Sequence, residues 1–412
     1  MQVSEKIENC RICESSKLVN VLHLGDQPPA NSLRKNRDET LPNIPLKLVF
    51  CENCSTVQLS DTVNPNFLFD HYVWVTGTSS TAIEYSQIFC ERLMSRLSEN
   101  KENPPFIVEI ASNDGTFLKR FVDAGCSVQG VDPAQNIVEI ALENGIPTRA
   151  DFFNRPVAED ICKSKGAASA VIARNVIPHV KEVHSIINGI AHLIGEEGLG
   201  VIEFHYARKI IDELHYDSVY HEHLFYFSIK TMGGLLERYG MKIFDVEESP
   251  ISGGSLVVYF SRVDKEKSDA LREIESYEDR VGMNELSTWQ QFSKACQDHA
   301  KSLTAMIHKA KESGPVIGYG ASARSSTLLN FCGLSDSDLD FIIDKNELKQ
   351  GLITPGSGIE IIPLGPDLEV LMNASAVVML AWNFEKEIEK EIRALGYTGP
   401  IIMPLPNEPR VI

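Results

Sequence analysis

Four cysteines in two closely spaced pairs constrain this chain more than any other feature. Cys10 and Cys13 form the first pair, and Cys51 and Cys54 form the second. A Cys-x-x-Cys pair presents two thiolates from one tight turn, and two such pairs complete the tetrahedral sulfur set that suits Zn²⁺. Because sulfur would fill every coordination position, no site remains for water, and the predicted metal is structural.

Two disulfides are the alternative use of these cysteines. Residues 14–50, which separate the pairs, make a longer gap than in most zinc ribbons, so spacing alone does not decide. The N-terminal residues contain no signal-peptide core, and we therefore expect a cytoplasmic protein, in which disulfides are rare. The metal is the favoured interpretation, since the other cysteines stand singly in apolar stretches, namely Cys90, Cys126, Cys162, Cys296 and Cys332.

Composition bounds the class of protein. A chain of 412 residues is too long for one ordinary core and predicts two or three domains. Its 43% apolar and 23% charged residues are typical of a soluble globular protein, and no apolar run approaches the roughly 18 residues of a membrane span. The net charge of −18 argues against nucleic-acid binding, which needs a basic face. A local basic pocket for a phosphorylated small molecule is compatible with this net charge. The sequence leaves the oligomeric state open and is compatible with a monomer.

The pattern along the chain predicts an α/β protein in three parts. Residues 1–70 are rich in Pro and Asn, and we expect a small lobe whose folding depends on the metal. Residues 71–265 begin with a helical segment and continue with short apolar runs between helix-length segments, a pattern typical of a parallel sheet with crossover helices. Residues 241–260 are predicted to close that sheet as an antiparallel pair. Residues 266–412 predict a charged helical segment and, from Gly314, a second α/β domain.

The first α/β unit carries a turn suited to a cofactor. A predicted strand ends at Ile110, small residues follow, and a helix begins near Phe117. Such a turn brings backbone N–H groups and a helix N-terminus against a ligand, although it is neither G-x-G-x-x-G nor a Walker sequence. Asp132 ends the next predicted strand, where a carboxylate can accept both ribose hydroxyls of an adenosine-type cofactor. This is the class I S-adenosylmethionine (SAM) arrangement.

Each part of this prediction has a structural alternative. Asn-Asp-Gly is common in ordinary turns, and Asp132 before Pro133 would also suit a helix cap, although we favour ribose binding. Asp151 and Phe152 either lie by the adenine amine and ring or simply end a hydrophobic strand. The residues predicted to contact SAM are Glu109, Ser112, Asn113, Asp114, Gly115, Asp132, Pro133, Asp151, Phe152 and Asn175.

Residues 216–227 are dense in acid–base side chains. The order Tyr-His-Glu-His runs from Tyr220 to His223 between aromatic residues. Two histidines at i and i+2 do not share a helix face, so a metal is the minor interpretation. Proton abstraction in a partly dry cleft fits better, because His is the natural base near neutral pH and Tyr can donate to a developing oxyanion. His179 follows the fourth predicted strand, where a catalytic and a structural role are about equally expected.

A second small-residue turn opens the C-terminal α/β domain. Residues 318–327 follow a predicted strand and start a helix, loosely as G-x-G-x-x-A, which suits a phosphate group. Alone, this turn would suggest a dinucleotide and a dehydrogenase, but the expected acid, Asp344, stands in a loop-like context. A plain turn without a ligand is the structural alternative.

Together these motifs resemble a known family. Over essentially its whole length the chain is similar to the three-domain sugar C-methyltransferases of deoxysugar pathways, which methylate C3 of nucleotide-linked 4-keto sugars. The resemblance implies a zinc lobe, a central SAM-binding domain and a C-terminal Rossmann-like domain, with the nucleotide sugar between the lobes. It is carried, in chain order, by the two CxxC pairs, LGDQPPANSL, SNDGT, GVDPAQN, NVIPHV, VYHEHLFYFS, ISGGSL, GYGASARSSTLLN, PGSGIEIIP and LAWNF.

The resemblance also implies roles for single residues. By motif match, Tyr220, Glu222 and His223 take the family's active-site positions, with His223 as the base at C3. His179 matches the histidine of the family's N-V-x-x-H element. Substrate contacts are implied for Tyr72, Trp74, Ser252, Gly253, Arg324 and Ser325.

Three positions depart from the family pattern. Trp74 stands where a substrate-contacting Tyr is common, and an indole offers no oxygen. Ser252 begins a Ser-Gly-Gly-Ser stretch where the family often has His, and Arg324 replaces a frequent Lys, although Arg grips a diphosphate at least as well. The first two departures leave open the sugar and whether carbon, oxygen or nitrogen is methylated. A non-catalytic nucleotide- or SAM-binding module is the alternative of a different class.

Overall fold

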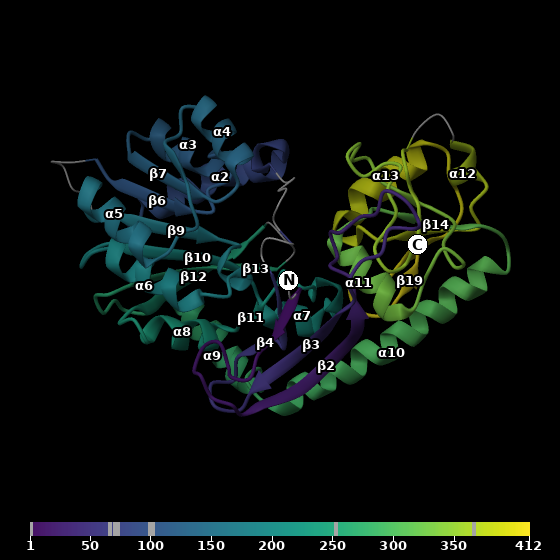
Figure 1. The fold of residues 1–412 in the computed structure, drawn as a ribbon, viewed down its shortest axis with the longest axis horizontal. Helices are drawn as coiled ribbons and strands as arrows, with labels where there is room; N and C mark the ends of the chain where they lie inside the picture. The colour runs from purple at the N-terminus through teal and green to yellow at the C-terminus, as the bar shows by residue number, and fades with distance from the viewer. Residues whose placement is uncertain (1–2, 65–67, 69–74, 98–103, 251–253, 365–367) are drawn as a thin grey trace.

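The chain folds into three parts, which we describe from a computed structural model. The structure describes residues 3–64, 68, 75–97, 104–250, 254–364 and 368–412. In Figure 1 two α/β bodies stand side by side, and the N-terminal sheet and helix α10 run beneath them. Four residues predicted to contact the substrate lie outside the described residues: Tyr72, Trp74, Ser252 and Gly253.

The N-terminal lobe is an antiparallel sheet next to the cysteine turns. Its described strands follow the order β11-β4-β3-β2. The strand β11 comes from the segment predicted to be catalytic, so that segment enters the lobe, which the predicted boundary at residue 70 did not anticipate. A separate antiparallel pair joins β1 to β5. The strands are β1 (Ser4–Lys6), β2 (Leu18–Gln27), β3 (Ile44–Cys51), β4 (Val57–Leu59), β5 (Asp61–Val63) and β11 (Phe225–Tyr226).

The central domain is a mixed sheet whose described strands follow the order β12-β13-β10-β9-β6-β7-β8. Within the described residues, β13 is the strand that runs against its neighbours, pairing antiparallel with β10 and β12. The predicted parallel sheet and its antiparallel closing pair are therefore confirmed. The strands are β6 (Phe106–Ile110), β7 (Ser127–Asp132), β8 (Thr148–Ala150), β9 (Ala170–Arg174), β10 (Leu199–His205), β12 (Lys242–Ser249) and β13 (Ser255–Ser261).

Helices cover both faces of this sheet because successive strand residues point to opposite sides. Ile107 packs in one cluster with Phe89 and Phe117 from α2 and α3, whereas Val108 packs in the other with Val157 from α5. The helices are η1 (Thr76–Thr78), α2 (Ser80–Met94), α3 (Thr116–Asp123), α4 (Gln135–Glu143), α5 (Arg155–Lys165), η2 (Ile177–His179), α6 (Val183–Leu193), α7 (Ala207–Asp212), η3 (Tyr216–Ser218) and α8 (Ile229–Glu237).

A second α/β domain follows two helices, as predicted. The helix α10 lies alongside β2 and carries the chain from one α/β body to the other (Figure 1). The described strands follow the order β16-β15-β14-β17-β18-β19, parallel except for β19. The elements are α9 (Asp269–Arg280), α10 (Leu286–Lys311), β14 (Val316–Tyr319), α11 (Ala323–Cys332), β15 (Ile342–Ile343), β16 (Ile361–Ile362), α12 (Leu368–Met372), β17 (Ala376–Met379), η4 (Trp382–Phe384), α13 (Glu385–Ala394), β18 (Ile401–Met403) and β19 (Arg410–Val411).

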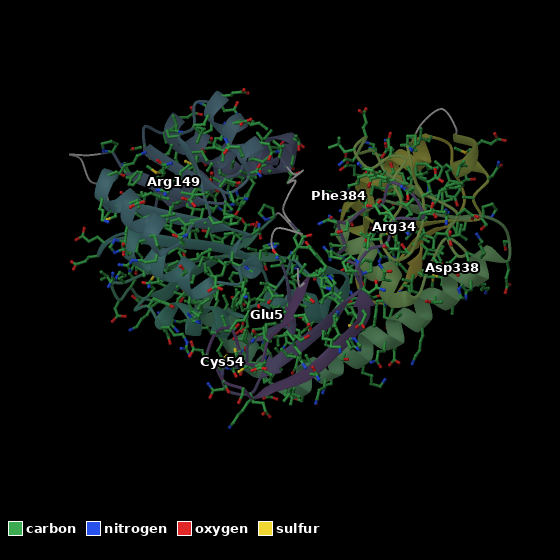
Figure 2. The ribbon with its side chains drawn as sticks, in the orientation of Figure 1. Glu5, Arg34, Cys54, Arg149, Asp338 and Phe384 are labelled. Carbon is green, nitrogen blue, oxygen red and sulfur yellow. The ribbon has the colours of Figure 1, made fainter. Side chains whose placement is uncertain are left out.

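The N-terminal lobe also reaches the C-terminal domain directly. Arg34 exchanges two backbone hydrogen bonds with Ile353, at 2.9 and 2.8 Å, and Arg37 forms an ion pair with Asp336. Figure 2 accordingly shows Arg34 among the side chains of the C-terminal domain. All three parts are thus joined by side-chain or backbone contacts, not by the chain alone. Among the described helices, none has the length and apolar character that a bilayer span requires.

Candidate active site

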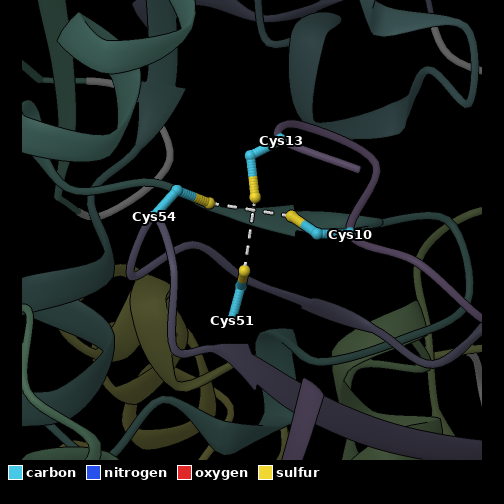
Figure 3. A group of neighbouring side chains, drawn as sticks. All are labelled: Cys10, Cys13, Cys51 and Cys54. Atoms are coloured by element: carbon cyan, nitrogen blue, oxygen red, sulfur yellow. Dashed lines mark hydrogen bonds between the residues drawn. The ribbon is translucent and has the colours of Figure 1, made fainter. Parts of the chain in front are cut away.

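The four paired cysteines converge on one point (Figure 3). Their sulfur atoms all lie within 4.8 Å of one another, with Cys10 3.7 Å from Cys54 and Cys13 3.5 Å from Cys51. Zn–S bonds of about 2.3 Å place tetrahedral sulfurs about 3.8 Å apart, whereas a disulfide needs about 2.0 Å. None of the nine cysteines, all of which the structure describes, forms a disulfide. The zinc site is confirmed and the disulfide alternative is wrong.

Both pairs use the same local turn. The amide of Glu14 donates to the Cys10 carbonyl at 2.9 Å, and the amide of Ser55 donates to the Cys51 carbonyl at 2.8 Å. Both residues adopt left-handed φ, 62° and 60°. The Gln58 side chain on β4 donates to the Cys10 sulfur at 3.0 Å, and Gln58 is also the backbone partner of Phe225 on β11. The metal site is therefore one strand away from the segment predicted to be catalytic.

The turn after β6 has the predicted strand–turn–helix geometry. The Asp132 carboxylate accepts the amides of Asn113 at 3.0 Å and Ala134 at 2.9 Å, so this acid closes the turn after β6 and the turn that leads into α4, whose N-cap residue is Ala134. Gly115 has a φ of 79°, and a Cβ there would lie 2.8 Å from Ile146. A carboxylate has about four lone-pair sites, so the oxygens of Asp132 can still accept ribose hydroxyls.

Two polar atoms at this turn fit a bound cofactor. Within the described residues, Glu109 Oε2 and Ser112 Oγ are buried and lack a hydrogen-bond partner. Burial raises the pKa of Glu109 to about 8, and Arg174, whose Nη1 lies 3.7 Å from its carboxylate, opposes that rise. A buried acceptor without a donor is costly, and the amino group of SAM would supply one. The donor set at this turn therefore fits SAM.

Other residues predicted to bind SAM are already engaged by the protein. Asn113 and Asp114 accept the amides of Thr76 and Gly77 at 2.8 and 2.9 Å, so η1 lies over the turn. At the end of β8, Asp151 pairs with Arg149 at 2.8 Å. Whether these side chains also contact SAM remains a prediction.

Three further SAM predictions concern residues at the strand ends. Phe152 is 61% exposed just after β8, which leaves its ring free to stack on an adenine. Pro133 is exposed at the end of β7. Asn175 follows β9 with a left-handed φ of 50°, and its amide donates to the Glu203 carbonyl on β10 at 2.8 Å. These positions put all three at the carboxyl edge of the sheet.

Asp132→Ala is expected to weaken SAM binding by about 2–3 kcal/mol, because it removes the predicted charge-assisted hydrogen bonds to the ribose and the carboxylate that holds the amides of Asn113 and Ala134. Isothermal titration calorimetry with SAM measures this. Asp123→Ala is a matched control, since Asp123 is exposed on α3 and pairs with Lys119. Equal SAM affinity in the Asp132 variant and the wild type would contradict the placement of the ribose.

Two separate segments bring the predicted catalytic side chains together. His179 ends η2 after β9, and Tyr220 and His223 follow η3. The ring centroids of Tyr220 and His223 are 4.0 Å apart, and those of His179 and His223 are 4.7 Å apart at a near-perpendicular angle. Three residues that the sequence predicted to be catalytic, Tyr220, His223 and His179, therefore have their rings packed together.

The tautomer of His223 is set by a backbone carbonyl. Its Nδ1 lies 2.8 Å from the Ser218 carbonyl oxygen, and because a carbonyl can only accept, Nδ1 carries the hydrogen and Nε2 the lone pair. Burial lowers the pKa of His223 well below its usual value and the pKa of His179 to about 4. Both imidazoles are therefore neutral at pH 7, and His223 has the form of a general base.

The N-terminal lobe holds the neighbouring residues of this segment. Asn31 donates to Glu222 at 2.6 Å, and burial raises the pKa of Glu222. His221 donates from Nε2 to the Ile44 carbonyl at 3.2 Å, so its ring faces the lobe. His179 and Glu222 line a small cavity of about 20 Å³. Asn31 was not predicted, and only its place in the motif LGDQPPANSL could have indicated it.

The C-terminal domain contacts the same segment through an ion pair that sequence analysis missed. Asp217 in η3 accepts from Arg324 Nε at 3.0 Å and from Nη2 at 2.9 Å, and Trp382 Nε1 donates to it at 2.8 Å. Ser325, predicted to bind substrate, forms the capping box of α11 with Ser322. No local signal pairs Asp217 with Arg324, because 107 positions separate them.

The strand order of the central sheet and the acid-closed turn after its first strand are those of a class I SAM-dependent methyltransferase. Three family models match the chain: a zinc binding domain at residues 10–69, a methyltransferase domain at 83–246 and a C-methyltransferase C-terminal domain at 250–406. The chain is 32% identical over 416 residues to C-methyltransferase NovU of Streptomyces niveus, covering 98% of this chain and 97% of that protein. It belongs to this family of SAM-dependent C-methyltransferases with a zinc-binding lobe.

Solved methyltransferase structures resemble part of the chain. Magnesium protoporphyrin IX methyltransferase from Synechocystis with bound SAM has a TM-score of 0.34 and 13% identity over 44% of this chain and 80% of that chain. A TehB-like SAM-dependent methyltransferase from Corynebacterium glutamicum has a TM-score of 0.32 and 13% identity over 43% and 88%. The family assignment rests on the family models and the full-length relative, not on these scores.

Proposed function

We propose that this C-methyltransferase acts on a nucleotide-linked 4-keto (deoxy)sugar and methylates the carbon beside the ketone. The observation that carries the proposal is the neutral His223, with its lone pair on Nε2, packed against Tyr220 and His179. A carbon beside a ketone becomes a nucleophile when a base removes one of its protons, and a cleft that excludes water protects the resulting enolate. Oxygen or nitrogen nucleophiles need no such carbanion.

In this mechanism His223 Nε2 takes the proton from the carbon next to the ketone. The electron pair of the C–H bond forms a C=C bond, and the ketone oxygen takes the negative charge. Bound SAM supplies the electrophilic methyl group. The Tyr220 hydroxyl donates to the enolate oxygen, and the anion in turn stabilises the imidazolium of His223, which burial alone disfavours.

The second predicted donor, His179, has a more limited role while it is neutral. Its ring makes a hydrogen bond to the backbone of Glu222, which raises its pKa but less than burial lowers it. That bond uses the single N–H of the neutral ring, so we propose Tyr220 as the principal oxyanion donor. We propose that Glu222, held by Asn31, orients an imidazole or binds a sugar hydroxyl.

We place the nucleoside diphosphate at the turn that opens α11. The amide of Ala321 donates to Asp344 at 2.7 Å, which repeats the contact between Asn113 and Asp132 at the SAM turn. In both α/β domains an acid at the carboxyl end of the next strand accepts an amide of the turn. The N-terminus of α11 supplies backbone N–H groups that suit a phosphate.

The proposed substrate is tested by product analysis with ¹³C-methyl SAM. A nucleotide-linked 4-keto sugar is expected to raise Tm and to gain one methyl group, and the NMR signal should be that of a carbon-bound methyl. The matched control is the corresponding 4-hydroxy sugar, which cannot form an enolate and should not be methylated. An oxygen- or nitrogen-bound methyl group would replace the proposal with an O- or N-methyltransferase on a related sugar or phosphorylated metabolite.

A further inference from the structure

We propose that the C-terminal domain positions the catalytic base through an interdomain clasp, formed by Asp217, Arg324 and Trp382. The inference rests on the proposed role of His223 as base. It assigns Arg324 a positioning role in place of the expected grip on the diphosphate. The C-terminal domain then contributes to the chemical step as well as to substrate binding.

The clasp is a fully partnered, buried carboxylate. Asp217 is 1% exposed and accepts three N–H groups, two from Arg324 and one from Trp382. The guanidinium lies 4.6 Å from the Trp382 ring centroid, and His215 packs against the same indole at 4.7 Å. A bidentate pair restrained by ring stacking fixes both the position and the orientation of the carboxylate. The backbone of η3 is thereby fixed to the C-terminal domain.

Asp217 of the clasp is next in sequence to Ser218, whose carbonyl sets the tautomer of His223. Ser218 follows Asp217, and its carbonyl accepts the Nδ1 hydrogen of His223 at 2.8 Å. On the other side of Ser218, the Val219 carbonyl accepts from the Thr327 hydroxyl of α11 at 3.1 Å. The C-terminal domain therefore holds the residues on both sides of this carbonyl. A shift of η3 would release His223 from its Nδ1–H tautomer.

The orientation of Arg324 argues against a primary role in binding phosphate. Its Nε and Nη2, which form one edge of the guanidinium, are both committed to Asp217. If a diphosphate bound to Nε and Nη2 of Arg324, the buried carboxylate of Asp217 would lose both of these donors and keep the Trp382 N–H. Removing the charged partner of a buried carboxylate is energetically unfavourable. The charge of Arg324 also adds to the effect of burial in lowering the pKa of His205, His215 and His223.

Kinetics of Arg324→Met and Asp217→Asn test the clasp. We expect kcat for methyl transfer to fall about 100-fold, as for a misplaced catalytic group, whereas KM for the nucleotide sugar changes by less than about 3-fold. Arg324→Lys keeps the charge and should recover part of kcat. Thr327→Val removes one hydrogen bond without leaving a buried charge, so it should fold even where the ion-pair variants do not, and should lower kcat less.

The tautomer of His223 is the second measurement, by ¹⁵N NMR of histidine-labelled protein without sugar or SAM. The wild type should show one Nδ1–H ring at His223, and the clasp variants a mixture of tautomers. Because this signal needs no substrate, it tests the clasp even if the substrate proposal fails. Arg410→Gln is the matched control: Arg410 pairs with Glu385 in the same domain, and its loss should change neither kcat nor the tautomer.

Three results would overturn the proposal. A raised KM with unchanged kcat in Arg324→Met would make Arg324 a substrate ligand. Unchanged kcat in every folded clasp variant would show that the C-terminal domain does not position the base. A lower kcat with His223 still in a single Nδ1–H tautomer would exclude the route through the Ser218 carbonyl.

Discussion

His223→Ala is expected to lower the rate of methyl transfer about 10²- to 10⁴-fold and to leave SAM affinity unchanged, because His223 is the proposed general base and is not part of the SAM turn. The sharpest measurement is solvent-deuterium exchange at the substrate carbon without SAM. The wild type should exchange that proton and the variant should not. His308→Ala serves as the control, since His308 is exposed and pairs with Asp338 far from this segment.

The pH dependence should report the same residue. The pKa of His223 is lowered by burial, so the neutral, basic form persists below the ordinary value for histidine of about 6.5. The acid limb of kcat/KM in the wild type should therefore lie below that pH, with activity rising as pH increases through the limb. An acid limb above pH 6.5, or proton exchange that survives in His223→Ala, would show that another group is the base.

Zinc removal is expected to have the largest effect on folding. Structural zinc contributes about 10–16 kcal/mol of apparent folding free energy in small zinc domains. Here the loss of zinc should also disturb the candidate active site, because Gln58 donates a hydrogen bond to the Cys10 sulfur and pairs through its backbone with β11. Cys51→Ser should therefore reduce the yield of folded protein before it reduces turnover per folded molecule.

Metal content and thermal unfolding measure this effect. One zinc per chain is expected, and a chelator should lower Tm and abolish the β4–β11 pairing. Cys162→Ser is the control, because Cys162 lies on α5 away from the metal site. A metal-free preparation with the Tm of the untreated protein would refute a structural zinc.

Local patterns in the sequence were sufficient for the elements and for two of the sites. Each Cys-x-x-Cys pair is a local motif, and Asn113 in the small-residue turn before Gly115 lies 19 positions from Asp132, so a few neighbouring residues indicated the chemistry of each site. The alternation of strands and helices likewise predicted both α/β domains, because periodicity and breakers are local properties. The candidate catalytic side chains were predicted from a dense run of acid–base residues and from the family resemblance, and their roles stay predictions.

The tertiary structure alone decided how these parts act on one another. Asn31 meets Glu222 across 191 positions, and Asp217 meets Arg324 across 107. It also decided that β11 belongs to the sheet of the zinc lobe. The residues around each partner do not indicate such pairs, because many donors in the chain could pair with a given buried carboxylate. The packing of the three parts determines which donor does. The amino-acid sequence by itself determined which candidate acid–base and metal-binding side chains are present, and the fold determined which of them lie in contact, because contacts such as Asp217 with Arg324 depend on how the three parts pack.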